Sequence, residues 1–182
     1  MYWRRDSDNR WADAAAKWPA QIFKTLKDAD IAQVSYVPDA GHAELIKACL
    51  ADNRIKTTRL TTEEEGIALS LGAWLGGDRS ALLMQSSGVG NCINMLSIIQ
   101  ETRSPLLMLV TMRGEWDEFN PWQVPMGRAT ADVLRAMGLS VHIVTEEDKL
   151  VKTIDAALYA AYSSDQQVAV LLSQQLVGRK EW

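Results

Sequence analysis

Two short stretches of the chain combine residue types that can do chemistry. Three glutamates, Glu63 to Glu65, open an apolar helical pattern that continues through small residues to Ala73. The sequence Ser87-Gly88-Val89-Gly90-Asn91 follows the next apolar strand. A first-turn carboxyl on the packed side of such a helix can hold a proton or share it with a ligand nitrogen. The alternative is that all three acids only complement the helix dipole.

The glycine pair Gly88 and Gly90 stands directly before a predicted helix. Because glycine has no side chain, two glycines at this spacing let the backbone approach a ligand closely. The stretch has neither the Lys-Ser/Thr of a P-loop nor a complete GxGxxG. An ordinary tight turn between strand and helix is therefore the alternative to a ligand site.

A long loop at 113–125 adds a cation and several aromatic side chains. Arg113 follows a buried strand, so its guanidinium is a candidate to bind an anionic ligand. The alternative is a salt bridge within the loop, to Glu115, Asp117 or Glu118. The loop also carries Trp116, Phe119 and Trp122. For these aromatic residues we favour an interface or a folded-back loop over a substrate lid. A loop that lined the pocket would indicate a bulkier or more apolar substrate.

The elements that position these residues follow from the apolar periodicity. Strands that are apolar on both faces alternate with helices, which is typical of a parallel sheet covered on both sides. The strands are expected at 33–37, 55–60, 81–85, 106–112, 141–144 and 168–172. The helices are expected at 11–26, with a kink at Pro19 or as two short helices, and at 42–50, 63–74, 90–100, 128–137 and 146–162. We therefore predict a doubly wound α/β fold with about six strands.

Ligands of doubly wound sheets bind beyond the carboxyl ends of the strands. Four loops follow predicted strands and should face one cleft, at 38–42, 61–65, 86–91 and 113–123. We divide the chain into a flexible arm at 1–10, one domain at 11–175 and a C-terminal tail at 176–182.

Composition excludes several classes of protein. The 182 residues carry a net charge of −4 without a run of Lys or Arg, which argues against a nucleic-acid surface or a basic membrane patch. No apolar run approaches the roughly 20 residues that span a bilayer. Cys49 and Cys92 form no CxxC motif, so we expect two reduced, buried thiols, no metal site and a cytoplasmic protein. The first residues do not resemble a secretory signal.

Several motifs taken together resemble one enzyme family. They are Glu63 with Gly72 nine residues later, and the stretches 62–66, 82–91, 112–115 and 123–127. These stretches read Thr-Glu-Glu-Glu-Gly, Leu-Leu-Met-Gln-Ser-Ser-Gly-Val-Gly-Asn, Met-Arg-Gly-Glu and Gln-Val-Pro-Met-Gly. The combination is similar to the pyrimidine-binding domain of thiamine-diphosphate enzymes. More narrowly, it resembles the α subunit of sulfopyruvate decarboxylase and the related phosphonopyruvate decarboxylases, over roughly residues 34–172.

The resemblance implies a role for one of the glutamates. In that family a glutamate hydrogen-bonds the aminopyrimidine ring of the cofactor and so prepares it to attack a 2-oxo acid. The spacing to Gly72 assigns this role to Glu63, with Glu64 and Glu65 as fallback candidates. The other cofactor contacts that the resemblance implies are Pro38, Ser87, Gly88, Val89, Gly90 and Asn91.

The resemblance also implies residues on the substrate side. His42 lies in a loop that borders the substrate in the family, so it is expected as a proton donor or anion contact. A histidine that only begins a helix is the alternative. Arg113 and Gln123 are expected to contact the substrate.

The family's diphosphate and metal site is a Gly-Asp-Gly followed some 25–30 residues later by Asn, and this chain lacks it. The resemblance therefore implies a β subunit that carries this motif and holds Mg²⁺ with thiamine diphosphate. We expect a homodimer within an α2β2 or larger assembly, acting on a 2-oxo acid. The alternatives are ligation or oxidation with the same cofactor, or a non-catalytic binding or assembly subunit.

Overall fold

The computed structural model describes residues 17–178. The expected arm at 1–10, the first part of the helix expected at 11–26, and residues 179–182 of the expected tail lie outside the described residues. Within 17–178, no helix combines the length and the hydrophobicity needed to cross a bilayer.

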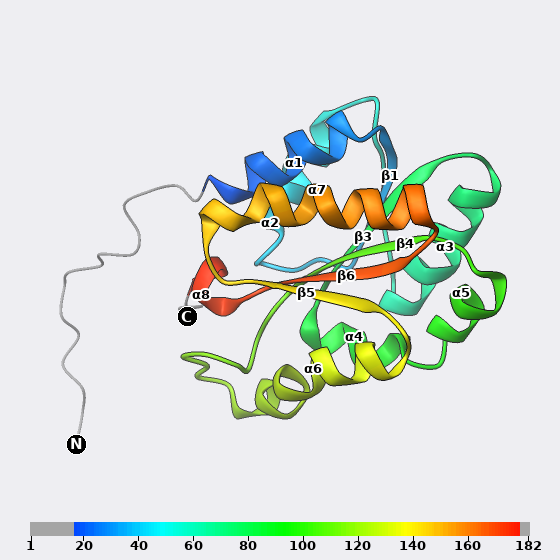
Figure 1. Ribbon diagram of the computed structural model, residues 1–182. Coiled ribbons are helices and arrows are strands. Elements are labelled where there is room, and N and C mark those ends of the chain that lie inside the picture. The colour runs from blue at the N-terminus through cyan, green and yellow to red at the C-terminus, as the bar shows by residue number, and fades with distance from the viewer. Residues whose placement is uncertain (1–16, 179–182) are drawn as a thin grey trace, which may run out of the picture.

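Six parallel strands form one sheet at the centre of the described chain (Figure 1). In spatial order they are β2 (Lys56–Arg59), β1 (Ile31–Tyr36), β3 (Arg79–Gln85), β4 (Leu106–Thr111), β6 (Gln167–Leu172) and β5 (Ser140–Val144). Every residue of β4 is buried, because helices cover both faces of the sheet. The predicted doubly wound α/β fold is therefore confirmed.

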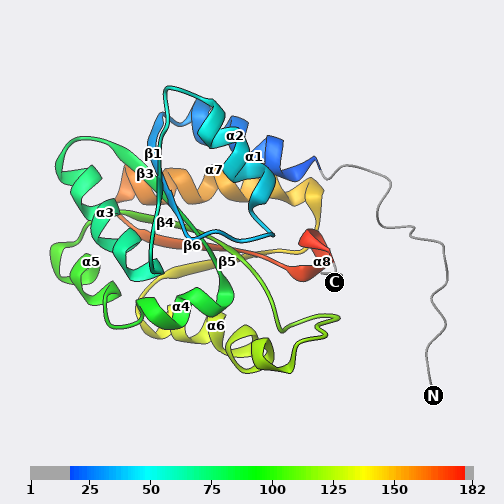
Figure 2. The same cartoon turned by 180° about the vertical axis from the view of Figure 1, so that it is seen from behind.

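The helices form two layers, one on each face of the sheet (Figures 1 and 2). On one face lie α1 (Trp18–Asp28), α2 (Ala43–Ala51) and α7 (Glu147–Ser164), which share one apolar core with the sheet. On the other face lie α3 (Glu63–Leu75), α4 (Ser86–Cys92), α5 (Leu96–Thr102) and α6 (Val124–Ala136), which share the second core. Two short helices, η1 (Pro121–Gln123) and α8 (Gln174–Val177), lie near the carboxyl ends of the strands.

The strand order places a topological switch point between β1 and β3. These two strands are neighbours, yet β1 leads into α2 on one face and β3 leads into α4 on the other. Loops that leave neighbouring strands in opposite directions open a crevice at the carboxyl edge of a sheet. The fold therefore offers a ligand site beside the loop at 38–42 and the start of α4.

Three helix boundaries differ from the sequence-based expectation. Pro19 lies in the first turn of α1, where a residue needs no N–H partner within the helix, and the part of the expected helix before residue 17 lies outside the described residues. The expected glycine turn before a helix at 90–100 is wrong, since α4 begins at Ser86 directly after β3 and the helix at 96–102 is separate. The helix expected from Arg128 begins at Val124, with Pro125 in its first turn.

Candidate functional site

Glu63 and α4 meet at the carboxyl edge of the sheet. Glu63 is the first residue of α3 and is half-buried. The side-chain amide of Asn91 donates a hydrogen bond to Glu63 Oε2 at 2.8 Å. The carboxyl group also packs directly on Gly88, where a β-carbon would overlap it. The acid and the glycine stretch that the sequence singled out are therefore brought together.

The two neighbouring glutamates are placed differently. Glu64 and Glu65 are both exposed. Glu65 Oε2 accepts a hydrogen bond from the backbone N–H of Thr61 at 2.9 Å, so this acid caps the start of α3. Thr62 occupies the N-cap position, but its hydroxyl makes no capping bond. Of the three glutamates, Glu63 is the one whose carboxyl packs on Gly88 of α4.

Position 88, in the first turn of α4, needs glycine because the Glu63 carboxyl leaves no space for a β-carbon. The peptide at Gly88 is buried beneath the Glu63 carboxyl, and Val89 beside it packs into the apolar core. Gly90 and Asn91 face solvent on the next turn. Since the Val89 side chain is buried, a ligand at this point would contact the backbone of the stretch.

The loop after β1 carries one exposed and one buried candidate residue, Pro38 and His42. Pro38 is exposed at the carboxyl edge. His42 is completely buried at the start of α2, where Nε2 donates to the carbonyl of Leu109 at 3.1 Å and Nδ1 has no partner among the described residues. Burial lowers the pKa of His42, so the imidazole is neutral at pH 7. This geometry matches the helix-start alternative, and a role of His42 toward substrate stays a prediction.

A polar cluster at the switch point was missed by the sequence analysis. Asp39 accepts hydrogen bonds from Gln85 Nε2, at 3.0 Å, and from Thr111 Oγ1. Ser87 Oγ donates to Gln85 Oε1 at 2.8 Å, which extends the cluster to α4. The cluster links the carboxyl ends of β1, β3 and β4. The signal was available, because Gln85 and Thr111 are polar residues that end otherwise apolar strands.

Arg113 forms a buried ion pair with Glu118. Its Nε lies 2.6 Å from Glu118 Oε2, and a second guanidinium nitrogen binds Oε1. The pair lowers the pKa of Glu118 to about 2, and it raises the pKa of Arg113. This is the salt-bridge alternative that the sequence left open. A substrate contact by Arg113 stays a prediction, and it requires the guanidinium to leave this pair.

The buried pair holds the long loop against α8. Gln174 Nε2 donates to Glu118 Oε2 at 2.9 Å, and Gln174 Oε1 accepts from the backbone N–H groups of Glu115 and Trp116, both at 3.0 Å. The ring of Phe119 lies 5.5 Å from the Arg113 guanidinium carbon. The loop is therefore folded back on the domain, as one of the favoured alternatives predicted. Glu118 was one of the three acids that the sequence offered as a partner for Arg113, whereas Gln174 had no recognisable sequence signal.

Close backbone contacts fix the base of this loop. Gly114 has φ +79°, and a β-carbon there would overlap the carbonyl of Gln123. A β-carbon at Gly127 would overlap the carbonyl of Arg113. The Gln123 Oε1 atom is buried without a partner among the described residues, so Gln123 lies at the loop base with its amide turned inward. Its substrate contact stays a prediction.

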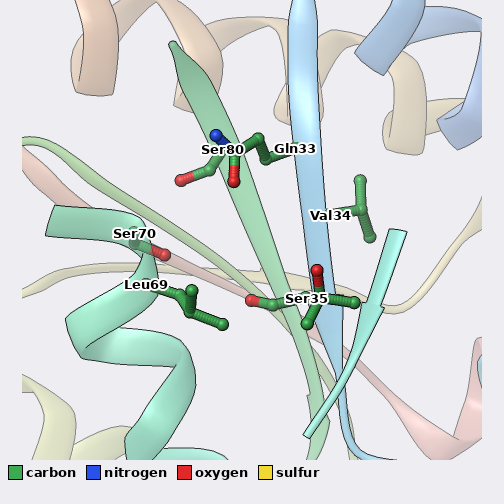
Figure 3. A pocket seen from close by; sticks show the side chains of 7 residues that line it. Gln33, Val34, Ser35, Leu69, Ser70 and Ser80 are labelled. Atoms are coloured by element: carbon green, nitrogen blue, oxygen red, sulfur yellow. The ribbon is translucent and has the colours of Figure 1, made fainter. Parts of the chain in front are cut away.

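A small hollow lies between α3 and the sheet, lined by Ser35, Ser70 and Ser80 among others (Figure 3). Its volume of about 10 Å³ suits one water molecule and no substrate. Ser70 Oγ is buried there without a partner among residues 17–178, so a water would satisfy it.

The described residues hold no group of three or more His, Cys, Asp and Glu arranged to bind a metal ion. The predicted burial of both cysteines is confirmed. Burial raises the pKa of Cys49 to about 11 and that of Cys92 to about 12, so neither thiol is a nucleophile at pH 7.

The chain is thus a doubly wound α/β domain in which the half-buried carboxyl of Glu63, the first residue of α3, packs against Gly88 of α4 beside the switch point. The chain is 33% identical over 152 residues to sulfopyruvate decarboxylase subunit alpha of Methanococcus maripaludis, covering 83% of this chain and 91% of that protein. It is 34% identical over 152 residues to sulfopyruvate decarboxylase subunit alpha of Methanothermobacter thermautotrophicus, covering 83% and 92%. The chain therefore belongs to the family of sulfopyruvate decarboxylase α subunits, and the sequence-based recognition is confirmed.

Longer proteins are also similar. Phosphonopyruvate decarboxylase of Streptomyces viridochromogenes is 31% identical over 146 residues, which are 78% of this chain and 36% of that protein. No family model matches the chain. Among solved structures, 2-oxoglutarate:ferredoxin oxidoreductase from Magnetococcus marinus is similar with a TM-score of 0.68 and 15% identity, covering 88% of this chain and 29% of that one. At this identity the likeness shows the fold alone.

Replacing Gly88 by Ala should destabilise the chain, although Gly→Ala inside a helix ordinarily stabilises it by about 1 kcal/mol. The reason is that the new β-carbon would overlap the Glu63 carboxyl. We expect a loss of about 1–3 kcal/mol in the free energy of unfolding, measured by denaturant titration. Gly76→Ala is the control, because its β-carbon would make ordinary contacts at 3.4 Å. Equal effects of both substitutions would contradict the packing of Glu63 on Gly88.

Replacing Glu118 by Gln should remove a pH-dependent part of the stability. The pKa of Glu118 is lowered by its pair with Arg113, so the ionised carboxyl stabilises the fold above its ordinary pKa. This contribution, about 3 kcal/mol, should disappear as the pH falls from about 5 toward 2. The free energy of unfolding should then depend less on pH in Glu118→Gln. Glu44→Gln, which breaks an exposed pair with Lys47, is the control and should behave as wild type.

Proposed function

We propose that this chain is the α subunit of a two-chain decarboxylase that acts on sulfopyruvate or a similar 2-oxo acid with thiamine diphosphate. The observation that carries the proposal is the Glu63 carboxyl, held on Gly88 by Asn91 at the carboxyl edge of the sheet. Two relatives of nearly the same length are named as this subunit. Two longer relatives, named sulfopyruvate decarboxylase and phosphonopyruvate decarboxylase, support the same class of reaction.

The residues present fit the pyrimidine half of the cofactor. Glu63 Oε2 is occupied by Asn91, whereas Oε1 receives no hydrogen bond from another residue in 17–178. Glu63 would therefore hold a proton at Oε1 and share it with a ring nitrogen of the cofactor. The backbone around Gly88 and Gly90 would pack on the ring, with the exposed Ser87 and Pro38 at its edges. When bound, the cofactor would supply the electron sink for loss of carbon dioxide.

Asn91 has a separate part in this proposal. Its amide fixes the orientation of the Glu63 carboxylate from the exposed side of α4. Without that bond the side chain of a half-buried glutamate could turn toward solvent. Asn91 would therefore position the proton-sharing oxygen and need not touch the cofactor.

A partner subunit would supply the diphosphate and metal site. The sequence lacks Gly-Asp-Gly, and the described residues offer no metal-binding group. The sulfopyruvate decarboxylase of Methanosarcina acetivorans, of which this chain covers 33%, is long enough to contain both parts. We place Mg²⁺ on the partner, and we propose an α2β2 or larger assembly in the cytoplasm.

The outer face of α3 supports an interface with another chain. Ala68, Leu69, Gly72 and Leu75 are exposed along this helix. A β-carbon at Gly72 would meet nothing within 4 Å, so no contact within the described chain explains the glycine. A helix that is apolar on its outer as well as its inner face is usually buried on both. Since α3 begins at Glu63, a chain docked on this face would border the site.

Replacing Glu63 by Gln should abolish turnover without unfolding the protein. The amide keeps the shape of the side chain and its contact with Gly88, but it cannot exchange a proton with a ring nitrogen. With the partner chain and cofactor present, we expect the rate of carbon dioxide release to fall about 100- to 10,000-fold. Glu64→Gln is the matched control and should keep near-normal rates, because Glu64 is exposed. Normal turnover by Glu63→Gln would refute the assignment.

A further inference from the structure

A surface hollow lies on the α2 side of the switch point. Its volume is about 390 Å³, within the range of small-molecule sites. Tyr36, Pro38, Asp39 and Ala40 contribute from the end of β1 and its loop, Ala43 and Ile46 from α2, and Arg59 from the end of β2. The hollow thus opens at the same edge of the sheet as Glu63, which follows Arg59 by four residues.

Arg59 is the cation of this hollow. Its guanidinium makes no hydrogen bond and no ion pair with another residue in the described part of the chain. The other arginine proposed for an anion, Arg113, is instead committed to Glu118. The acid in the lining, Asp39, is also committed, because Gln85 and Thr111 donate to its two carboxylate oxygens. Asp39 keeps its negative charge, since both of its donors are neutral, so the group that the hollow offers to an anion is the guanidinium of Arg59.

We propose that Arg59 binds the terminal sulfonate or phosphonate of the 2-oxo acid, a role that rests on the proposed function. A guanidinium presents parallel N–H donors that match two oxygens of such a group. Tyr36 and Ile46 line the hollow beside Arg59 and give the carbon chain of the acid an apolar surface. Arg59 is thus a specificity-determining residue, which selects acids with a second anionic group over pyruvate.

The interaction should act on substrate binding and leave the chemical step unchanged. The terminal anion lies one methylene from the keto carbon and is not part of the bond that breaks, so Arg59 is expected to hold it equally in the ground state and the transition state. Loss of such uniform binding raises KM and leaves kcat unchanged. We expect Arg59→Gln to raise KM for sulfopyruvate or phosphonopyruvate about 10- to 100-fold, whichever the wild type prefers. Arg59→Lys should recover part of the loss, since it restores the charge without the fork.

The test uses the complete complex with its partner chain, cofactor and Mg²⁺. KM and kcat are measured for wild type, Arg59→Gln and Arg59→Lys with the preferred dianionic acid and with pyruvate. Arg54→Gln removes the same charge from the loop before β2, where Arg54 pairs with Asp52, and should change nothing. A rise in KM confined to the dianionic acid and to the Arg59 variants supports the inference. Equal KM values in wild type and Arg59→Gln overturn it and leave the decarboxylase proposal standing.

A binding measurement separates the two claims if the wild type turns over no acid. The unreactive 3-sulfopropanoate and 3-phosphonopropanoate are titrated calorimetrically into the complex, with propanoate as the control. No turnover would count against the proposed function. Anion binding that wild type shows and Arg59→Gln loses would still support the Arg59 site. Equal binding by both, or no binding by wild type, would overturn it.

Discussion

The contact between the Glu63 carboxyl and Gly88 is the constraint on which the site depends. It requires α3 and α4 to begin at the same edge of the sheet, and it requires glycine within the first turn of α4. The hydrogen bond from Asn91 then fixes which carboxylate oxygen is used and which is left for a ligand. Glu63 is positioned by the first turns of two helices, α3 after β2 and α4 after β3, so its position does not depend on a flexible loop.

The remaining polar groups of the edge support that contact from the neighbouring strands. Asp39 joins the ends of β1, β3 and β4, and the ion pair of Arg113 and Glu118 holds the long loop after β4. Both are charged groups whose partners are already provided within the chain. Removing Arg113 or Glu118 would leave an uncompensated buried charge, so this ion pair holds its loop firmly. Arg59 differs, because its charge is unpaired and is available to a ligand.

The sequence predicted the fold because the physical signals for it are local. Strands apolar on both faces require a parallel sheet between helices, and β4 shows this directly. Glu63 was chosen from the resemblance, by its spacing to Gly72, and its role toward a cofactor stays a prediction. The contact of its carboxyl with Gly88 is what the structure adds. The sequence offered a salt bridge of Arg113 within its loop but could not choose among three acids, and the structure selects Glu118. The cluster at Asp39 depends on which loops meet in space, so side-chain type alone could not select it. Arg59 was missed for the same reason, as its significance comes from the hollow around it and from the commitment of Arg113.

The measurement that tests the central claim most directly is carbon dioxide release from sulfopyruvate by this chain and its partner, mixed and separately, with thiamine diphosphate and Mg²⁺. The account predicts release that requires both chains, because it assigns Glu63 and the pyrimidine side of the site to this chain and the metal and diphosphate side to the partner. Release by this chain alone would contradict the half-site. A mixture that binds the cofactor but releases no carbon dioxide from any 2-oxo acid would contradict the decarboxylase assignment.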